Sequence, residues 1–145
     1  MEGINSRLDG LQAAILSAKM PHLSKWTERR RTIAALYADM LGAVGDLVLP
    51  SLAEGNTHVY HLFVIRTALR DALRNHLAHA NISTGINYPR ALPFYPAYGY
   101  LRHVAEDFPV AYSEQSRILS LPIYPEMTDE MVDYVAASIR QFYSH

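Results

Sequence analysis

Apolar residues recur at the spacing of an amphipathic helix in three long stretches of the chain. The first begins near residue 8 and should end or kink at Pro21, because a proline ring cannot be accommodated inside a helix. The second is expected to start at a Ser24 N-cap and to stop at Gly42, and the third to follow a Thr128 N-cap. The apolar positions of the three stretches are Leu8, Leu11 and Ile15, then Trp26, Ile33, Leu36, Tyr37, Met40 and Leu41, and then Met131, Val132, Val135, Ile139 and Phe142.

Shorter elements are expected between these long helices. β-Branched and aromatic residues predict strands, and helical apolar spacing predicts a helix that stops at Asn81. The prolines at positions 89, 93 and 96 exclude a long regular element from their segment, since each removes a backbone donor. The expected strands span residues 58–67, 82–88 and 119–125, and the expected helices span 68–80 and 108–118. The pattern predicts an α+β domain with long N-terminal helices and a small antiparallel sheet of about three strands with flanking helices.

The composition is that of an ordinary globular domain and removes several classes of function. At 145 residues the chain is long enough for one domain with a core of its own. The formal net charge of −1 gives no general attraction to nucleic acid, and the absence of cysteine excludes disulfides and thiolate metal sites. The sequence has no apolar run as long as a membrane span and no signal-peptide pattern at its start. We therefore expect a cytoplasmic protein that binds neither membrane nor nucleic acid.

Two groups of basic residues each allow more than one interpretation. His76 and His79 are three residues apart on an expected helix and could face one ion. No carboxylate completes the set, so a solvated pair is favoured and no metal site is expected. Arg29 to Arg31 form a basic run whose side chains fan out around the helix axis. A solvated face is favoured for this run, and binding of phosphate or DNA is the alternative.

Two stretches have the chemistry of a binding site. At the start, Asn5, Ser6 and Arg7 precede a helix, where free N–H groups and the helix dipole favour an anion such as phosphate. The alternative is an ordinary helix start, with Asn5 or Ser6 as N-cap and Arg7 in solvent. Residues 87–100, NYPRALPFYPAYGY, suit the wall of a ligand pocket, or else a crossover whose rings pack under the sheet.

The opening segment and several later ones resemble one family when they are taken together. GINSRLDGLQAAIL, residues 3–16, is similar to the pattern Gly-x-Asn-x-Arg-[Leu/Met]-Asp…Gln-Ala-Ala-[Ile/Leu]-Leu of the DegT/DnrJ/StrS sugar aminotransferases. The resemblance continues in order over nearly the whole chain, through LSKWTERRRTIAALYADML, HVYHLFVIRT, RDALRNHLAHANISTGINYP and DFPVAYSEQSRILSLPIYPEMTDEMVDYVAASI. It implies the fold of the aspartate aminotransferase type and a homodimer with active sites at the subunit interface. It also implies transfer of an amino group by pyridoxal 5′-phosphate (PLP), usually from glutamate, to a keto group on a nucleotide-linked sugar.

The resemblance covers only the C-terminal part of the family, so residues 1–145 are expected to form the small C-terminal domain without the large PLP-binding domain. In the family, the large domain supplies the lysine that forms the Schiff base with PLP, the acidic partner of the pyridine nitrogen and the ring that stacks on the cofactor. Lys19 and Lys25 do not match the family's catalytic stretch and are expected to be solvated helix residues. No catalytic residue is therefore expected in this chain, which alone should neither bind PLP nor transaminate.

Four residues are candidates for contacts with cofactor or substrate through the resemblance. Asn5 matches the family asparagine that reaches across the dimer interface to the PLP phosphate of the neighbouring subunit, and Arg7 occupies the family's arginine position. Tyr88 matches the tyrosine just before the loop that faces the active site. In that loop many members read Pro-Leu-His-x-Gln-Pro-Ala-Tyr where this chain reads ALPFYPAY, which places Pro93 at the histidine and Tyr95 at the glutamine. Tyr88 and Tyr95 are the expected substrate contacts, and any contact made by the family histidine is absent.

These observations predict the C-terminal domain of a sugar aminotransferase, present as an expressed fragment or a shortened gene product. In the whole enzyme, the domain would complete the partner's phosphate site through Asn5 and close over the nucleotide-linked sugar. The alternative is a stand-alone interaction or regulatory module that keeps the dimerisation surface, with Arg29 to Arg31 as its point of contact. A folded remnant without function is the third interpretation.

Overall fold

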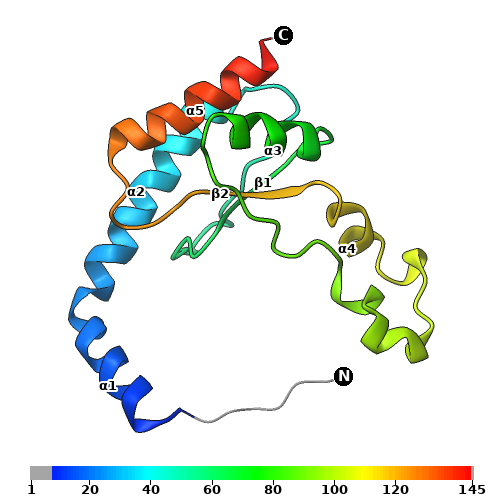
Figure 1. The fold of residues 1–145 in the computed structure, drawn as a ribbon, viewed down its shortest axis with the longest axis horizontal. Helices are drawn as coiled ribbons and strands as arrows, with labels where there is room; N and C mark the ends of the chain where they lie inside the picture. The colour runs from blue at the N-terminus through cyan, green and yellow to red at the C-terminus, as the bar shows by residue number, and fades with distance from the viewer. Residues whose placement is uncertain (1–7, 145) are drawn as a thin grey trace.

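The computed structural model describes residues 8–144 and begins with a nearly continuous helical rod (Figure 1). The rod consists of α1 (Gly10–Lys19), a 3₁₀ turn η1 (Met20–His22) and α2 (Leu23–Leu41). Pro21 lies in the 3₁₀ turn, so the expected end of the first helix is confirmed. The expected Ser24 N-cap is wrong, because His22, the residue before α2, already has helical backbone angles and leaves no extended residue to act as a cap. Gly42 is the C-cap, as expected.

The sheet consists of two antiparallel strands, β1 (Phe63–Arg66) and β2 (Ile118–Leu121). In this register Phe63 lies opposite Leu121, and Ile65 lies opposite Leu119. One backbone bridge extends the sheet on each side, from Val48 to Arg66 and from Gly85 to Ser120. The sheet is therefore small and antiparallel, as expected, with two strands and two flanking bridges.

All three expected strands are shorter than the sequence pattern predicts. The strand expected over 82–88 is reduced to the bridge at Gly85. Beyond that bridge the segment meets β2 through the Asn87 side chain, which accepts a hydrogen bond from the Ser120 hydroxyl at 3.0 Å. The strand expected over 58–67 starts only at β1, because Tyr60 has a positive φ of 46° and turns the chain ahead of it.

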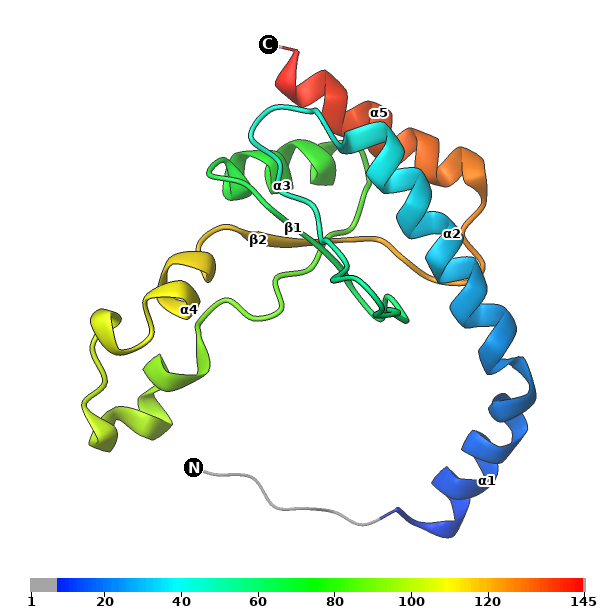
Figure 2. The same ribbon diagram turned by 180° about the vertical axis from the view of Figure 1, so that it is seen from behind.

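Three helices lie on one side of the sheet and enclose the core with it (Figures 1 and 2). They are α2, α3 (Arg70–His79) and α5 (Asp129–Tyr143). The large side chains that are fully buried in this layer are Ile33, Tyr37, Leu41, Phe63, Ile65, Leu73, Leu77, Leu119, Val132 and Ile139. Each such side chain contributes ~1.5–3 kcal/mol by leaving water, so this layer holds the domain together. The expected α+β fold is confirmed.

The boundaries of α3 and α5 follow the expected signals. Asn81 has a left-handed φ of 58° just after α3, and the Thr128 side chain accepts a hydrogen bond from the Met131 backbone N–H at 3.3 Å. The expected burial of the apolar stripe of α5 is confirmed at Val132, Val135 and Ile139. It is wrong for Met131, whose side chain is 48% exposed. Spacing alone placed Met131 in the core, but its side chain lines a hollow open to solvent, beside Tyr124.

The helix expected over 108–118 is also shorter. It is α4, Pro109–Glu114, and its C-cap is Gln115. Residues from Ile118 onward belong to β2, which ends before Pro122, a residue that cannot donate to a strand ladder. The strand expected over 119–125 therefore starts one residue earlier and ends four residues sooner.

A polar network fixes the end of α5 to the loop before β1. The Thr67 and Tyr143 hydroxyls donate to Asp46 Oδ1 at 2.6 and 2.7 Å, and the Ala68 backbone N–H donates to Oδ2 at 2.7 Å. Burial would raise the pKa of the Asp46 carboxyl, but these hydrogen bonds hold it below its usual value. Burial, followed by the nearby Asp46 charge, raises the pKa of Tyr143 to about 12.

Two parts of the chain project from the helix-covered sheet, on opposite sides of it (Figures 1 and 2). We call α1 with η1 the N-terminal arm, and residues 88–117 the aromatic lobe. The lobe contains η2 (Leu92–Phe94), η3 (Pro96–Leu101), η4 (Ala105–Asp107) and α4. As expected, its proline-rich part forms only short 3₁₀ turns. Among residues 8–144, no helix has the length and apolar character that a membrane crossing needs.

Candidate functional site

The rings of the aromatic lobe pack against one another rather than under the sheet. The Phe94 ring lies 5.2 Å from Tyr112 and 6.5 Å from Phe108, and His103 lies 4.9 Å from Phe108, measured between centroids. All three contacts are edge-on, the arrangement that aromatic pairs favour. The expected alternative of a crossover packed under the sheet is therefore wrong, because this cluster belongs to the lobe itself.

A hollow of about 260 Å³ opens in the lobe. It is lined by Leu92, Pro93, Tyr98, Leu101 and His103. Pro93, which the resemblance matches to a family histidine, is thus part of an apolar wall, as expected for the side of a ligand pocket.

The two tyrosines expected to contact substrate lie at different places on the lobe. Tyr88 is 70% exposed at its start, and Tyr95 is half-buried between η2 and η3. The backbone carbonyl of Tyr95 accepts a hydrogen bond from the Tyr98 N–H at 2.9 Å, which closes the turn into η3. No hydrogen bond or ring contact within residues 8–144 joins Tyr88 to Tyr95, so the chain alone does not bring them into one contact set.

An ion pair attaches the base of the lobe to the sheet, and a second ion pair and a hydrogen bond close the base itself. Glu114 Oε1 lies 3.4 Å from Arg66 Nη1, on β1, and 3.6 Å from Arg117 Nη1. Gln115 Oε1 accepts a hydrogen bond from the Ala91 N–H at 2.9 Å, which joins the two ends of the lobe. The sequence analysis did not predict these contacts of Glu114. The Glu114–Arg117 spacing can be seen in the sequence, but Arg66 comes close to Glu114 only when the chain folds.

The Glu114 carboxylate is the polar centre of this attachment. Its side chain is 20% exposed, and its Oε2 atom is buried without a hydrogen-bond partner among the described residues. Two guanidinium groups on one carboxylate oxygen leave a net positive environment at the lobe's base. Loss of this carboxylate would leave both guanidinium groups unpaired, so the attachment depends on it.

The N-terminal arm carries the opening motif, and its helix start is already capped. Asp9 is the N-cap of α1, and its Oδ1 accepts a hydrogen bond from the Gln12 N–H at 2.7 Å. The expected capping of this helix by Asn5 or Ser6 is therefore wrong. The Asp9 carboxylate also occupies the place where the helix dipole would favour an anion. Asn5 and Arg7, the expected cofactor contacts, lie outside the described residues together with Ser6.

The arm has an apolar surface without a partner in this chain. No residue of α1 is buried. The exposed fractions of its large apolar side chains include 73% at Leu11, 52% at Leu16 and 61% at Met20. Several exposed large apolar side chains on one short helix are typical of a region that packs against another domain or subunit.

The arginine run is not the solvated face that its sequence suggests. Arg29 forms an ion pair with Asp129 at 2.8 Å and links α2 to α5. Each of the three guanidinium groups donates to a backbone carbonyl: Arg29 to Met127 at 3.1 Å, Arg30 to Ile123 at 2.9 Å, and Arg31 to His58 at 3.0 Å. The run therefore fixes the connections around α2, because carbonyl oxygens are the acceptors that a guanidinium fork fits.

The histidine pair also has internal roles. His76 Nε2 is 3.0 Å from the Ser138 carbonyl and joins α3 to α5, and His79 Nδ1 is 2.7 Å from the carbonyl of Asn75 in its own helix. His76 is half-buried, so the expected solvated pair is wrong for this residue. The part of the chain that the structure describes holds no group of three or more metal-ligating side chains.

Comparison with known proteins gives consistent relatives. The Pleiotropic regulatory protein of Geobacillus stearothermophilus is 44% identical over 145 residues, covering 99% of this chain and 39% of that protein. The dTDP-3-amino-3,6-dideoxy-alpha-D-galactopyranose transaminase of Aneurinibacillus thermoaerophilus is 40% identical over 141 residues, covering 97% of this chain and 38% of the transaminase. The crystal structure of S. venezuelae DesV with a ketimine intermediate superposes with a TM-score of 0.91 at 35% identity, over 100% of this chain and 39% of DesV.

The chain thus spans less than two-fifths of the length of these relatives. The model of one aminotransferase family matches residues 1–140, which is nearly the whole chain. With that match, the chain belongs to the DegT/DnrJ/EryC1/StrS aminotransferase family.

Proposed function

We propose that this chain is the C-terminal small domain of a cytoplasmic, PLP-dependent aminotransferase that acts on a nucleotide-linked keto sugar. The observation that carries the proposal is the superposition on DesV over the full chain, at a TM-score of 0.91. The transaminase of Aneurinibacillus thermoaerophilus, which is named for a dTDP-linked amino sugar, supports the class of substrate. Residues 1–145 then correspond to the last two-fifths of a longer catalytic unit.

The described residues do not fit a complete PLP site. When bound, PLP supplies an electron sink for amino-group transfer, and the protein must hold it through a deprotonated lysine amine. Lys19 and Lys25 are the only lysines of the sequence, and both are exposed on the rod of α1 and α2. We therefore assign no catalytic step to this chain, and we expect it to be inactive without the large domain.

Its role is to complete the site of a partner subunit in a homodimer. Asn5 would reach the PLP phosphate of the partner, with Arg7 beside it, as the family resemblance implies. The apolar N-terminal arm supports such packing, because its exposed side chains need a neighbouring domain or subunit.

The aromatic lobe would lie toward the sugar, through Tyr88 and Tyr95. Pro93 lines an apolar hollow where many family members carry a histidine. This exchange removes a donor from the pocket, so the sugar accepted by this protein is expected to differ from that of the histidine-containing members.

Replacement of the matching residues of a relative tests the proposal. In a chimera, this chain would replace the part of the Aneurinibacillus thermoaerophilus transaminase that it matches, and the rest of that transaminase, including its large domain, would be kept. We expect the chimera to transfer an amino group to a nucleotide-linked keto sugar and this chain alone to show no activity. A chimera that folds and binds PLP but transfers no amino group to any nucleotide sugar would contradict the proposal.

A regulatory or interaction module is the second candidate. It is favoured by the name of one relative, the Pleiotropic regulatory protein of Geobacillus stearothermophilus. The internal hydrogen bonds of Arg29, Arg30 and Arg31 weigh against it, because these side chains were its expected point of contact. Borohydride reduction of the full-length protein with PLP separates the two, since only the enzyme gives a pyridoxyl-lysine adduct.

A further inference from the structure

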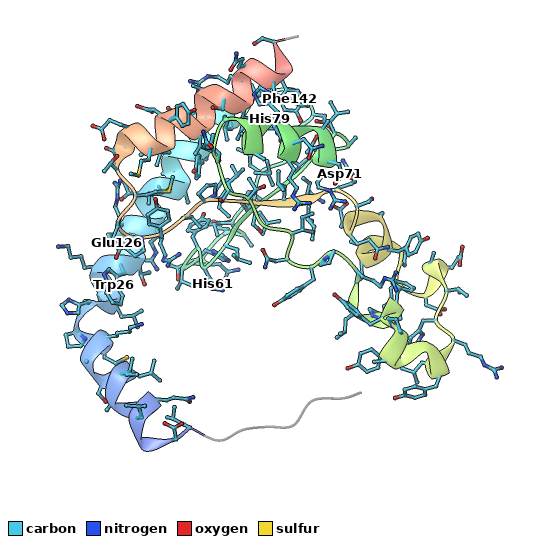
Figure 3. The ribbon with its side chains drawn as sticks, viewed as in Figure 1. Trp26, His61, Asp71, His79, Glu126 and Phe142 are labelled. Atoms are coloured by element: carbon cyan, nitrogen blue, oxygen red, sulfur yellow. The ribbon has the colours of Figure 1, made fainter. Side chains whose placement is uncertain are left out.

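A second hollow lies on the core, away from the aromatic lobe. It is formed by the first half of α5, the segment that leads into it and the loop after α3, and its volume is about 460 Å³. Figure 3 shows Glu126 near this end of α5, whereas Asp71 lies at the opposite end of the core, toward α4. We call this hollow the α5 groove; neither the N-terminal arm nor the lobe contributes to its walls.

The walls of the α5 groove are mostly apolar and open to solvent. Tyr124, Met131 and Tyr134 line it and are 42%, 48% and 55% exposed, while Met127 and Ile82 form its buried floor. An enclosed ligand site would cover most of a small molecule, whereas these walls suit a side chain presented by another protein. Two methionines among the lining residues also allow the surface to adapt its shape to a partner.

Hydrogen bonds hold the wall side chains in place before any partner binds. The Tyr134 hydroxyl donates to the Ala80 carbonyl at 3.1 Å, and the Tyr124 hydroxyl lies 3.6 Å from Met131 Sδ. Because the rings are already positioned, a partner would lose less side-chain entropy on docking.

The charge around the groove is acidic on the α5 side. Glu130 is the one charged residue that lines the groove, and its pKa is held below the usual value, mainly by its own backbone N–H and the Thr128 side chain. Residues 124–135 contain Glu126, Asp129, Glu130 and Asp133 and no cationic residue. Arg29 forms an ion pair with Asp129, and its charge contributes less than the Glu130 backbone and Thr128 hydrogen bonds to the lowered pKa of Glu130. At the end of the groove formed by the loop after α3, Arg74 lines an adjoining hollow. Its positive charge disfavours binding of a partner's cation at that end.

We propose that the α5 groove is a docking surface for a segment of a partner protein that presents an apolar side chain next to a lysine or arginine. The apolar side chain enters between Met131 and Tyr134, and the cation pairs with Glu130. The proposal goes beyond the proposed function and does not depend on it, since the groove involves neither the arm nor the lobe.

A fluorescent peptide binding assay tests the proposal on the whole chain. The probe is a fluorescein-labelled helical peptide with leucines on one face and lysines beside them, and its counterpart has glutamate in place of lysine. We expect the basic probe to bind with a Kd of about 10 μM and the acidic one at least about tenfold more weakly. Met131→Lys should weaken the basic probe at least about tenfold, and Glu130→Lys should reverse the preference between the two peptides.

Two variants far from the groove serve as matched controls. Val110→Lys places a cation at a 72% exposed apolar residue of α4, and Glu106→Lys reverses an exposed charge in η4. Both should bind the probes like the unmodified chain, and circular dichroism should show the same fold for all variants. Equal losses in the control and groove variants, an unchanged peptide preference in Glu130→Lys, or no binding at about 100 μM would overturn the proposal.

Discussion

Among the described glycines, Gly45 is the one at which an added Cβ would lie closest to another atom. Its φ is +53°, and a Cβ at this position would lie 2.1 Å from Cδ1 of Tyr143, whose hydroxyl also binds Asp46. Two separate constraints therefore require glycine here: the backbone conformation and the close approach of the ring. Together they hold the end of α5 against the loop that leads to β1.

Gly45→Ala is expected to lower the free energy of unfolding by about 2–4 kcal/mol, as the sum of left-handed strain and overpacking. Gly55→Ala is the matched control, because Gly55 has a φ of +77° but no atom within 4 Å of its added Cβ. In the control, only the left-handed strain should lower the free energy of unfolding, by about 1–2 kcal/mol. Chemical denaturation of both variants makes the comparison. Equal losses would show that the Tyr143 contact has no energetic weight.

The Asp46 network gives stability that depends on pH. Because the folded pKa of Asp46 is below its unfolded value, its contribution is present above the unfolded pKa and is lost as the pH falls through the folded pKa. Asp46→Asn should therefore cost about 1 kcal/mol at neutral pH, a small figure because the carboxylate is exposed, and progressively less below about pH 4. Denaturation curves at several pH values measure this, and a loss that stays constant down to pH 3 would refute the role of the charge.

At the scale of elements, several signals that are local in sequence were reliable, although the expected Ser24 cap was wrong. Thr128 caps α5 as its residue type predicts, since a cap needs only the next three residues. The roles of Arg29 and Met131 could not be predicted, because each depends on which distant segment lies beside it. The strand expected over 82–88 failed for the same reason: the Asn87 side chain meets β2 in place of a backbone pair.

The candidate site was predictable only in part. The aromatic composition of residues 87–100 indicated a pocket wall, and an apolar hollow lies there with Pro93 in its lining. Its attachment through Glu114 was missed, because the partner Arg66 lies on β1, far away in the sequence. The phosphate contacts Asn5 and Arg7 fall outside the described residues and stay predictions.

The aromatic lobe should loosen when its attachment to the sheet is removed. Glu114→Gln takes away the charge shared by Arg66 and Arg117, at a site that is only 20% exposed. We expect faster amide hydrogen exchange at Ala91 and in α4, by about tenfold, with unchanged exchange in β1. Glu106→Gln, at an exposed residue of the same lobe, is the control. Unchanged lobe exchange in Glu114→Gln, or equal effects of both variants, would show that the ion pairs do not hold the lobe.

At the scale of the whole molecule, the fold has one self-sufficient part and two dependent ones. Three helices and the sheet enclose a core, whereas the N-terminal arm has no buried residue in α1 and the lobe packs mainly on itself (Figure 1). Such projections are typical of surfaces that become buried in a larger assembly. This shape agrees with a chain that spans less than two-fifths of its relatives' length.

The central claim is that Asn5 completes the cofactor site of the other subunit, and mixed dimers of the chimera test it most directly. One chimera lacks the Schiff-base lysine of the large domain but keeps Asn5, and the other keeps the lysine but carries Asn5→Ala. In a mixed dimer, one site combines the intact lysine with the partner's intact Asn5. We predict that this site binds PLP as tightly as the unmodified chimera, whereas the Asn5→Ala dimer binds at least about tenfold more weakly. Mixed dimers in which no site regains the unmodified affinity would contradict the account.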